Sequence, residues 1–340
     1  MQKLIDAIYK THEDREALSK PRTYMGGSMI GKECDREVWL AFRHAILPTF
    51  DGRMLRLFQR GHREEPAFVE ELIEIGIEVH QLKADGSQFG VEAIEGHAKG
   101  HLDGVLLNVP DFEEIPHLFE AKTESKKRWQ ALSKNGVVKE HPVHFVQMQF
   151  YMGLMELPAA IYLSVCKDDD RIHCERIEFD PGAFAAIMER ARNLVYLKDA
   201  PERITEDPTR FVCKFCDFRP LCHGKTFPLA GCRTCVAATP NKQGGWTCDK
   251  HEKDLSLDDQ LTGCDDHLFL PNLVPGEAIA TTVDPSSITY DIDGVQVVNS
   301  ATAWKSKELE GLSSGSVLET VAKVKGIFGG QVISEEEATS

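Results

Sequence analysis

The residues best suited to chemistry are an aspartate, a glutamate and a lysine in the first half of the chain. Asp103 lies in Gly100-His-Leu-Asp-Gly104, and Glu120 and Lys122 lie in Leu118-Phe-Glu-Ala-Lys122, a short apolar run that predicts a strand. Alternation along a strand places Glu120 and Lys122 on one face. Two carboxylates can hold a hard divalent cation while a lysine orients the attacking water. This combination predicts metal-dependent hydrolysis of phosphodiester bonds.

Three further residues extend the pattern on both sides. Glu65 ends the segment Arg60-Gly-His-Arg-Glu-Glu65 in one predicted helix, and Gln147-Met-Gln-Phe-Tyr151 lies in another. The i, i+4 spacing places Gln147 and Tyr151 on the same helix face. Glu64 and His62 compete with Glu65 for the position of the helical acid, and the spacing does not decide between them.

In this order and context, the motifs resemble those of the PD-(D/E)XK nuclease superfamily, and most closely its RecB-like exonucleases and CRISPR-associated iron–sulfur exonucleases. The resemblance spans residues 24–226. It implies an α/β fold, with a PD-(D/E)XK restriction-endonuclease-like core in which a mixed sheet is flanked by helices. The chain departs from the family name at one position, because Leu102 precedes Asp103 where a proline would stand.

The resemblance also implies a metal site. Asp103, Glu120 and the backbone carbonyl of Ala121 would bind one or two Mg²⁺ or Mn²⁺ ions through oxygen. Glu65 would hold the metal or its bound water. These roles are expectations carried over from the family.

The remaining motif residues would act on the water and the DNA. Lys122 would position the nucleophilic water and offset charge at the scissile phosphate. Gln147 and Tyr151 would steady the DNA and the lysine. The expected activity is that of a DNA exonuclease acting on single-stranded ends in recombination, repair or phage or bacterial DNA processing. The alternatives are a structure-specific endonuclease and a catalytically silent nucleic-acid-binding scaffold.

A first group of cysteines forms a second signal. The run Cys213-Lys-Phe-Cys216-Asp-Phe-Arg-Pro-Leu-Cys222 supplies three ligands, and Cys34 is the natural fourth. One distant cysteine with a compact triplet resembles the [4Fe–4S] site of the CRISPR-associated exonucleases and the AddB-type nucleases. Such a cluster would tie the two ends of the core together. Zinc is the alternative, because four thiolates also form a common zinc shell.

A second group of cysteines follows the first. Cys232-Arg-Thr-Cys235 is followed by Trp246-Thr-Cys248-Asp-Lys-His251 and by Gly263-Cys264-Asp-Asp-His267. This spacing predicts a zinc ribbon on Cys232, Cys235 and Cys248, with either His251 or Cys264 as the fourth ligand. A second iron–sulfur cluster and a loop without metal are the other interpretations. Cys166 and Cys174 lie in strand-like runs and are expected to be small core residues.

The charge of the chain is unusual for a DNA enzyme. The 340 residues carry a net charge of -15, whereas affinity for DNA comes from neutralising phosphates. Basic residues nevertheless gather near the motifs, where they are candidate phosphate contacts beside a possible stacking platform at Trp129. The alternative is a solvated face. The candidates are Arg60, Arg63, Lys126, Lys127 and Arg128.

The organisation predicted for the chain has three parts. Residues 1–228 form the nuclease core with its iron–sulfur cluster, 229–275 the zinc ribbon, and 276–340 a hairpin turning at Asp293-Gly294 and a flexible tail. DNA ends are the expected partner, and the sequence identifies no helicase or recombination partner. The absence of an apolar leader or membrane-length run, together with clustered cysteines, predicts the reducing cytoplasm of a bacterium or a phage-infected host.

Overall fold

The computed structural model describes residues 1–281, 286–312, 320–323 and 325. Its contacts divide the chain into two compact units. Unit 1 comprises residues 1–32 and 49–192, and unit 2 comprises residues 33–48 and 193–340. This division does not follow the domain boundaries predicted at residues 228 and 275, which stay a prediction. The predicted flexible tail lies largely outside the described residues.

Unit 1 is built on a mixed five-stranded sheet, which confirms the predicted α/β class. Within this sheet, β6 and β7 are parallel and the other neighbouring pairs are antiparallel. A parallel pair needs a crossover, and the helices between β6 and β7 supply it. In spatial order the strands are β2 (Glu78–His80), β5 (Gly104–Leu107), β6 (His117–Glu124), β7 (Ala159–Cys166) and β8 (Ile172–Glu178).

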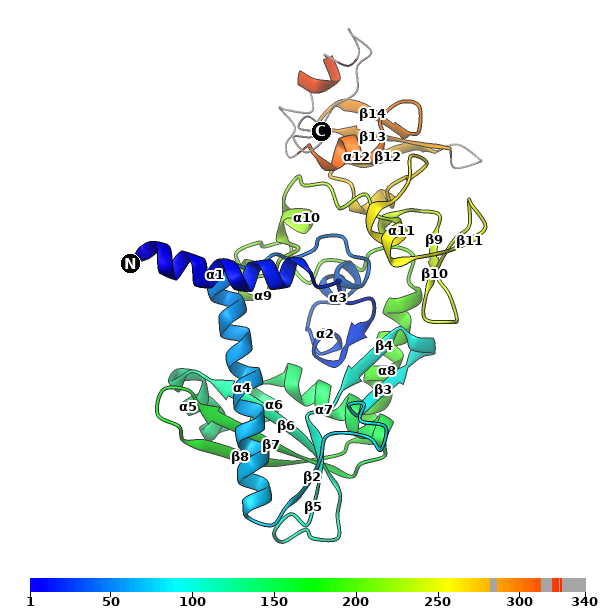
Figure 1. Ribbon diagram of the computed structural model, residues 1–340. Helices are drawn as coiled ribbons and strands as arrows, with labels where there is room; N and C mark the ends of the chain where they lie inside the picture. Colours follow the sequence, from blue (N-terminus) through cyan, green and yellow to red (C-terminus); the bar gives the residue numbers. More distant parts are fainter. Residues whose placement is uncertain (282–285, 313–319, 324, 326–340) are drawn as a thin grey trace. The chain divides into compact units, whose positions relative to one another are not determined.

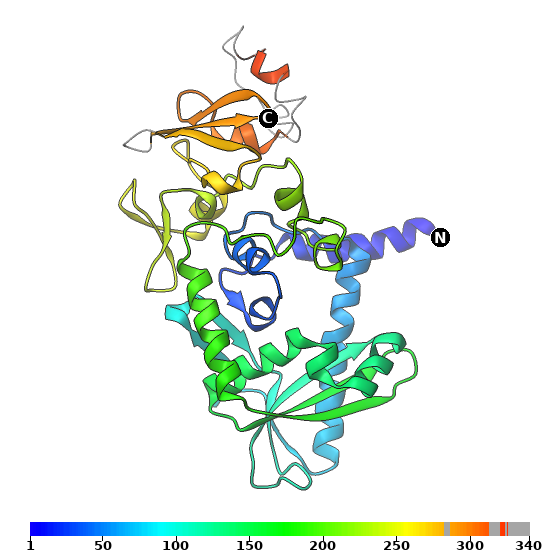
Figure 2. The ribbon, with the colours of Figure 1, turned by 180° about the vertical axis from the view of Figure 1, so that it is seen from behind.

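The two faces of this sheet carry different side chains. Phe119 packs with Phe68 and Leu72 of helix α4 (Gly52–Glu74) in one buried apolar cluster. Because side chains alternate along β6, Glu120 and Lys122 point to the opposite face. Figures 1 and 2 show α4 on one side of the sheet and α5 (Lys126–Asn135), α6 (Val137–Glu140) and α7 (Pro142–Met155) on the other. β6 therefore directs Glu120 and Lys122 toward α7, whose Gln147 bonds Glu120.

The sequence pattern predicts one strand over residues 98–108, but the structure has two strands there, in different sheets. β4 (Ala98–His101) pairs with β1 (Met25–Gly26) and with β3 (Gly90–Ala93), whereas β5 pairs with β2 and β6. The switch occurs at Leu102, which is fully buried and donates its backbone N–H to the Phe89 carbonyl at 3.0 Å. The prediction of one continuous strand was wrong. As a result Asp103 stands at a break between sheets rather than within a strand.

The other elements of unit 1 largely match the periodicity of the sequence. The sequence pattern predicts helices over residues 1–20, 53–74, 142–156 and 181–198, and the structure has all four, within a few residues of those ends. The short helices of this unit were not predicted from the sequence. The remaining elements are α1 (Gln2–Ala17), α2 (Gly27–Ile30), η1 (Ile94–Gly96) and α8 (Pro181–Tyr196), in whose last turn the division between the units falls.

Unit 2 contains short helices and two small antiparallel sheets. One sheet has the order β11-β10-β9 and the other the order β12-β13-β14. The helices are α3 (Asp35–Phe42), α9 (Phe211–Lys214), α10 (Arg219–His223), η2 (Cys232–Thr234), α11 (Leu257–Thr262), η3 (Pro271–Leu273) and α12 (Ser306–Glu310). The strands are β9 (Ala238–Pro240), β10 (Trp246–Cys248), β11 (Lys253–Leu255), β12 (Glu277–Thr281), β13 (Ser287–Ile292) and β14 (Val295–Ser300).

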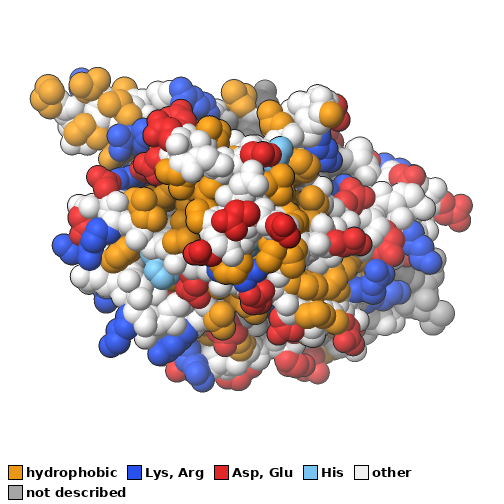
Figure 3. Space-filling model, turned by 90° about the horizontal axis from the view of Figure 1, so that it is seen from below, with side chains coloured by type: hydrophobic (Ala, Val, Ile, Leu, Met, Phe, Trp, Pro, Cys, Tyr) orange, Lys and Arg blue, Asp and Glu red, His pale blue; other side chains and the backbone are white. Residues whose placement is uncertain are grey.

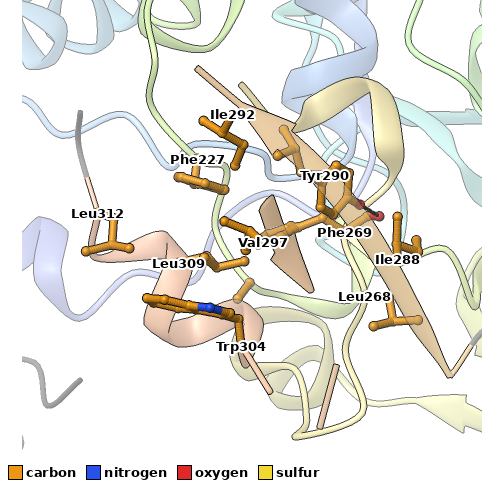
Figure 4. Packing of buried hydrophobic residues seen from close by; sticks show 12 residues of the cluster. Phe227, Leu268, Phe269, Ile288, Tyr290, Ile292, Val297, Trp304, Leu309 and Leu312 are labelled. Atoms are coloured by element: carbon orange, nitrogen blue, oxygen red, sulfur yellow. Dashed lines mark hydrogen bonds between the residues drawn. The ribbon is translucent and has the colours of Figure 1, made fainter. Parts of the chain in front are cut away.

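The predicted hairpin is confirmed as β13 and β14. Asp293 and Gly294 both have positive φ, as a two-residue turn between twisted strands requires. Its inner face packs against Phe269, whose carbonyl accepts a 2.9 Å hydrogen bond from the Tyr290 hydroxyl (Figure 4). Leu309 of α12 and Trp304 close the same buried cluster. Among the described residues, no helix is both long and apolar enough to span a bilayer.

Candidate active site

Asp103 is held by the edge of the strand that carries the other motif residues. Its Oδ2 accepts a 2.8 Å hydrogen bond from the backbone N–H of Ala121. This bond is possible because Asp103 immediately precedes β5, whose first residue, Gly104, pairs with Phe119. The register of β5 on β6 therefore sets the distance between Asp103 and Glu120.

Glu120 is the most deeply buried carboxylate of the group. Its side chain is 0% exposed, and its Oε1 accepts hydrogen bonds from Lys122 and, at 2.8 Å, from the Gln147 side-chain amide. The Lys122 ammonium also lies 3.2 Å from the carbonyl oxygen of Ala121. α7 thus supplies a donor that fixes one oxygen of a carboxylate on β6.

Glu65 reaches the same place from α4, through a residue that the sequence analysis missed. The Gln81 side-chain amide donates to Glu65 Oε1 and to the backbone carbonyl of Asp103, at 3.0 Å in each case. Glu64 instead lies 3.6 Å from Arg60 in an ion pair on α4. Of the two adjacent acids, Glu65 is the one that the structure brings to Asp103. No sequence motif marked Gln81, because its role depends on the break before β5.

The clustered charges perturb one another. Burial raises the pKa of Glu120 to about 7, and Asp103 adds to the rise while Lys122 opposes it. Burial and Asp103 also raise the pKa of Glu65. For Lys122, burial lowers the pKa, but Glu120 and Asp103 outweigh burial and leave it raised. Glu120 and Glu65 both resist ionising at this site, so further positive charge is needed before both are fully ionised.

Tyr151 lies one helical turn beyond Gln147 on α7 and packs against glycines. A Cβ at Gly100 would stand 2.3 Å from the Tyr151 ring, and a Cβ at Gly27 would stand 3.1 Å from both Tyr151 and the Gln147 side chain. Burial raises the pKa of Tyr151, and Glu120 and Asp103 raise it further, so the phenol stays neutral. The bare backbone at Gly100 therefore creates the space that the Tyr151 ring occupies.

Asp103, Glu120 and Glu65 supply carboxylate oxygens for a metal ion but do not surround one common point. Among the described residues, no three His, Cys, Asp or Glu side chains are arranged so that they could hold a metal ion. One atom nevertheless fits a cation: Glu120 Oε2 is buried and has no hydrogen-bond partner in the described part of the chain. A buried carboxylate oxygen without a donor is costly unless a cation or water satisfies it. The oxygen-only donor set of Asp103, Glu120 and Glu65 suits Mg²⁺ or Mn²⁺.

Some of the basic residues predicted to contact DNA already have partners within the protein. Arg60 donates to the carbonyl of Lys167 at 2.8 Å, Lys126 lies 3.4 Å from Asp169, and Arg128 lies 3.0 Å from Glu124. Arg63 and Lys127 are exposed. Figure 3 shows basic side chains interspersed with acidic and hydrophobic ones on one face of the molecule, without a broad basic field there.

Trp129 does not fit the stacking role predicted for it. Its side chain is 7% exposed, its Nε1–H donates to the Ser164 carbonyl at 3.2 Å, and the Arg171 guanidinium lies 4.4 Å from the ring centroid. The prediction rested on the position of Trp129 beside the basic residues, whereas α5 turns the ring inward against β7. A base has no open ring face on which to stack.

The first group of cysteines gathers within unit 2. Cys34, at the N-terminus of α3, lines one pocket together with Cys213, Cys216 and Cys222. Burial raises the pKa of Cys216 to about 12 and also raises that of Cys222, and the Cys34 thiol adds to both shifts. Thiols this reluctant to ionise need a metal or another cation nearby before they become thiolates.

The second group of cysteines gathers separately in unit 2. Cys232, Cys235, Cys248 and Cys264 line one cavity, and His251 and His267 line it as well. Of the two cysteines predicted to be core residues, Cys166 is buried, but Cys174 is exposed on the edge strand β8, so that prediction was wrong for Cys174.

No family model matches the chain, and no curated protein matches its sequence. The solved structures similar to it include the protein SSO0001, at a TM-score of 0.37 and 17% identity over 65% of this chain and 96% of the other. They also include the alkaline exonuclease LHK-Exo from Laribacter hongkongensis, at a TM-score of 0.34 and 17% identity over 54% and 90%. The same enzyme in complex with dAMP has a TM-score of 0.36 at 17% identity, over 55% and 89%. Likenesses this weak support no conclusion about activity.

Proposed function

We propose that this protein is a PD-(D/E)XK-type DNA exonuclease that hydrolyses phosphodiester bonds with Mg²⁺ or Mn²⁺. The observation that carries the proposal is the meeting of Asp103, Glu120 and Lys122, joined through the Ala121 N–H and the Lys122 ammonium. Carboxylates from two chain segments around one lysine are the residue types that metal-assisted phosphodiester hydrolysis uses.

In this proposal each side chain has a distinct task. Asp103, Glu120 and Glu65 would hold the metal, which supplies charge neutralisation at the phosphate and lowers the pKa of water. Lys122, anchored by Glu120, would orient the attacking water and stabilise negative charge developing at the phosphate. Gln147 and Gln81 would fix the two glutamates from opposite sides. Arg63 and Lys127 are the exposed candidates for phosphate contact.

The proposal includes two metal centres outside the active site. Cys34, Cys213, Cys216 and Cys222 would hold a [4Fe–4S] cluster, supported by their shared pocket within unit 2. The second group of cysteines would hold zinc. We place the protein in the cytoplasm, where reduced thiols persist, and in recombination, repair or phage DNA processing.

A digestion series tests the activity. Linear single strands labelled at the 5′ or the 3′ end should shorten stepwise in Mg²⁺, while a closed circular strand of the same sequence should remain intact. Cutting of the circle would establish the endonuclease alternative. Binding to DNA without any cleavage in Mg²⁺ or Mn²⁺ would establish the silent scaffold.

A further inference from the structure

The second group of cysteines comes together from three separate segments of unit 2. Cys232 is the first residue of the short helix η2 and Cys235 follows its last, and the N–H of Cys235 donates to the Cys232 carbonyl at 3.0 Å. Cys248 ends β10, which pairs with β9 so that Cys248 stands opposite Ala238. All three cysteines are 8% exposed. Three thiols from η2 and β10 therefore line one cavity. A tetrahedral zinc site needs a fourth ligand.

The backbone brings Cys264 to the same cavity. Gly263, which ends α11, has a positive φ, and a Cβ there would stand 2.1 Å from the Ala230 carbonyl. A Cβ at Gly231 would stand 2.5 Å from the carbonyl of Gln260, on the same helix. Two glycines therefore let the end of α11 press against the chain just before Cys232. This close approach is a reason for glycine at both positions and brings Cys264 to the cavity that Cys232 and Cys235 line.

The two histidines of the cavity have other partners. His251 Nε2 lies 3.5 Å from an Asp266 carboxylate oxygen and 3.7 Å from the Cys264 sulfur. His267 Nε2 lies 3.0 Å from the Gly231 carbonyl and 3.2 Å from the Thr234 hydroxyl. A histidine nitrogen that faces a carboxylate and a sulfur can donate to both. His251 is thus placed to support the Cys264 thiolate from outside the metal shell.

We propose that Cys232, Cys235, Cys248 and Cys264 form a four-thiolate zinc site, with His251 as a hydrogen-bonding neighbour of Cys264 and not a ligand. The thiols do not yet form a coordination shell in the described residues, so zinc would draw them inward as it binds. Lys250 and Lys253 also line the cavity, each paired with an aspartate of the same lining, Asp266 at 3.0 Å and Asp259 at 2.9 Å. This assignment rests on the zinc site of the proposed function and does not depend on the nuclease activity.

The coordination shell of the full-length protein tests this proposal. X-ray absorption at the zinc edge should show four sulfur neighbours at about 2.3 Å, and no nitrogen at about 2.0–2.1 Å. The spectrum should be the same for Cys34→Ala, which removes any zinc bound at the first group of cysteines. A shell of three sulfurs and one nitrogen would overturn the assignment. Absence of zinc, with the four cysteines paired in disulfides or bound to iron, would overturn the site itself.

Zinc content of matched variants provides a second measurement. His251→Ala should retain the four-sulfur shell and bind zinc about 10- to 100-fold more weakly, as expected for loss of a supporting neighbour. Cys264→Ser should lose one zinc per chain under the same conditions, and Cys174→Ser, outside the cavity, should lose none. Retention of zinc in Cys264→Ser together with its loss in His251→Ala would make His251 the ligand. A nitrogen neighbour that persists in His251→Ala would point to His267.

Discussion

The side-chain amide of Gln147 donates a 2.8 Å hydrogen bond to Glu120, across the interface between α7 and the central strand β6. The same carboxylate oxygen also accepts from Lys122, so two donors hold Oε1 and leave Oε2 without a partner among the described residues. A fixed carboxylate with one oxygen left over has the form of a preorganised metal ligand. In the proposed enzyme, Gln147 therefore acts through Glu120.

Removing that donor should weaken the site without dismantling it. We expect Gln147→Ala to lower the cleavage rate about 10- to 100-fold, the usual cost of losing a partner of a metal ligand. Gln147→Glu should cost more, because it places a second negative charge against a buried carboxylate. Titration of the rate against Mg²⁺ concentration is the measurement, and the midpoint should move to higher Mg²⁺ in both variants. An unchanged midpoint in both would mean that Gln147 does not position the ligand.

The proposed catalytic residues should each be indispensable. Asp103→Ala, Glu120→Ala and Lys122→Ala should each reduce cleavage of end-labelled DNA in Mg²⁺ by at least about 100-fold, because each removes a ligand or a charge stabiliser. Circular dichroism should show that the fold survives. A variant that kept turnover close to that of the wild type would refute the role given to that residue. Glu65→Ala should behave like these variants and Glu64→Ala should not, because only Glu65 faces Asp103.

Gln81 should matter although no motif contains it. It joins Glu65 to the Asp103 carbonyl, so Gln81→Ala should free the helical acid and lower the cleavage rate about tenfold or more. The exposed Gln88→Ala is the matched control and should cleave at the wild-type rate. If the two variants behaved alike, the bridge from Gln81 would have no part in the reaction.

Local sequence patterns predicted the positions of some residues of the candidate site but not of others. Alternation in Leu118–Lys122 placed Glu120 and Lys122 on one face, and the i, i+4 spacing placed Gln147 and Tyr151 on one side of a helix. Gln81 could not be found in this way, because its two bonds depend on the chain leaving one sheet at Leu102 and entering another. Trp129 was misplaced because its burial depends on how α5 packs against β7. Both cases turn on tertiary contacts between segments that local periodicity does not relate.

The proposed cluster at the first group of cysteines should be visible. Protein purified without oxygen should be brown, from charge transfer between thiolate and iron, and Cys34→Ala should bleach it because Cys34 is the one ligand outside the compact triplet. Cys174 is an exposed cysteine on β8, so the control variant Cys174→Ser should keep the brown colour. Elemental analysis should find about four irons per chain. Zinc alone in colourless protein handled strictly without oxygen would replace the cluster with a zinc site.

His144 should make the protein sensitive to acid. Its Nδ1 lies 2.9 Å from the Tyr162 hydroxyl, and burial, reinforced by Lys122, lowers its pKa to about 2. Because an unfolded histidine binds a proton near pH 6.5 and the buried one does not, the unfolded state takes up more protons below that pH. The contribution of His144 is therefore complete above about pH 6.5 and declines as the pH falls toward 2.

Urea unfolding of wild type and His144→Gln at a series of pH values measures this contribution. Glutamine can still bond Tyr162 but does not titrate. The variant should lose less stability on acidification, with a slope reduced by up to about 1.4 kcal/mol per pH unit below pH 6. If the unfolding free energy fell with pH at the same slope in the two proteins, His144 would be protonated as readily in the folded state as in the unfolded one. The assignment of His144 as a buried neutral imidazole would then be wrong.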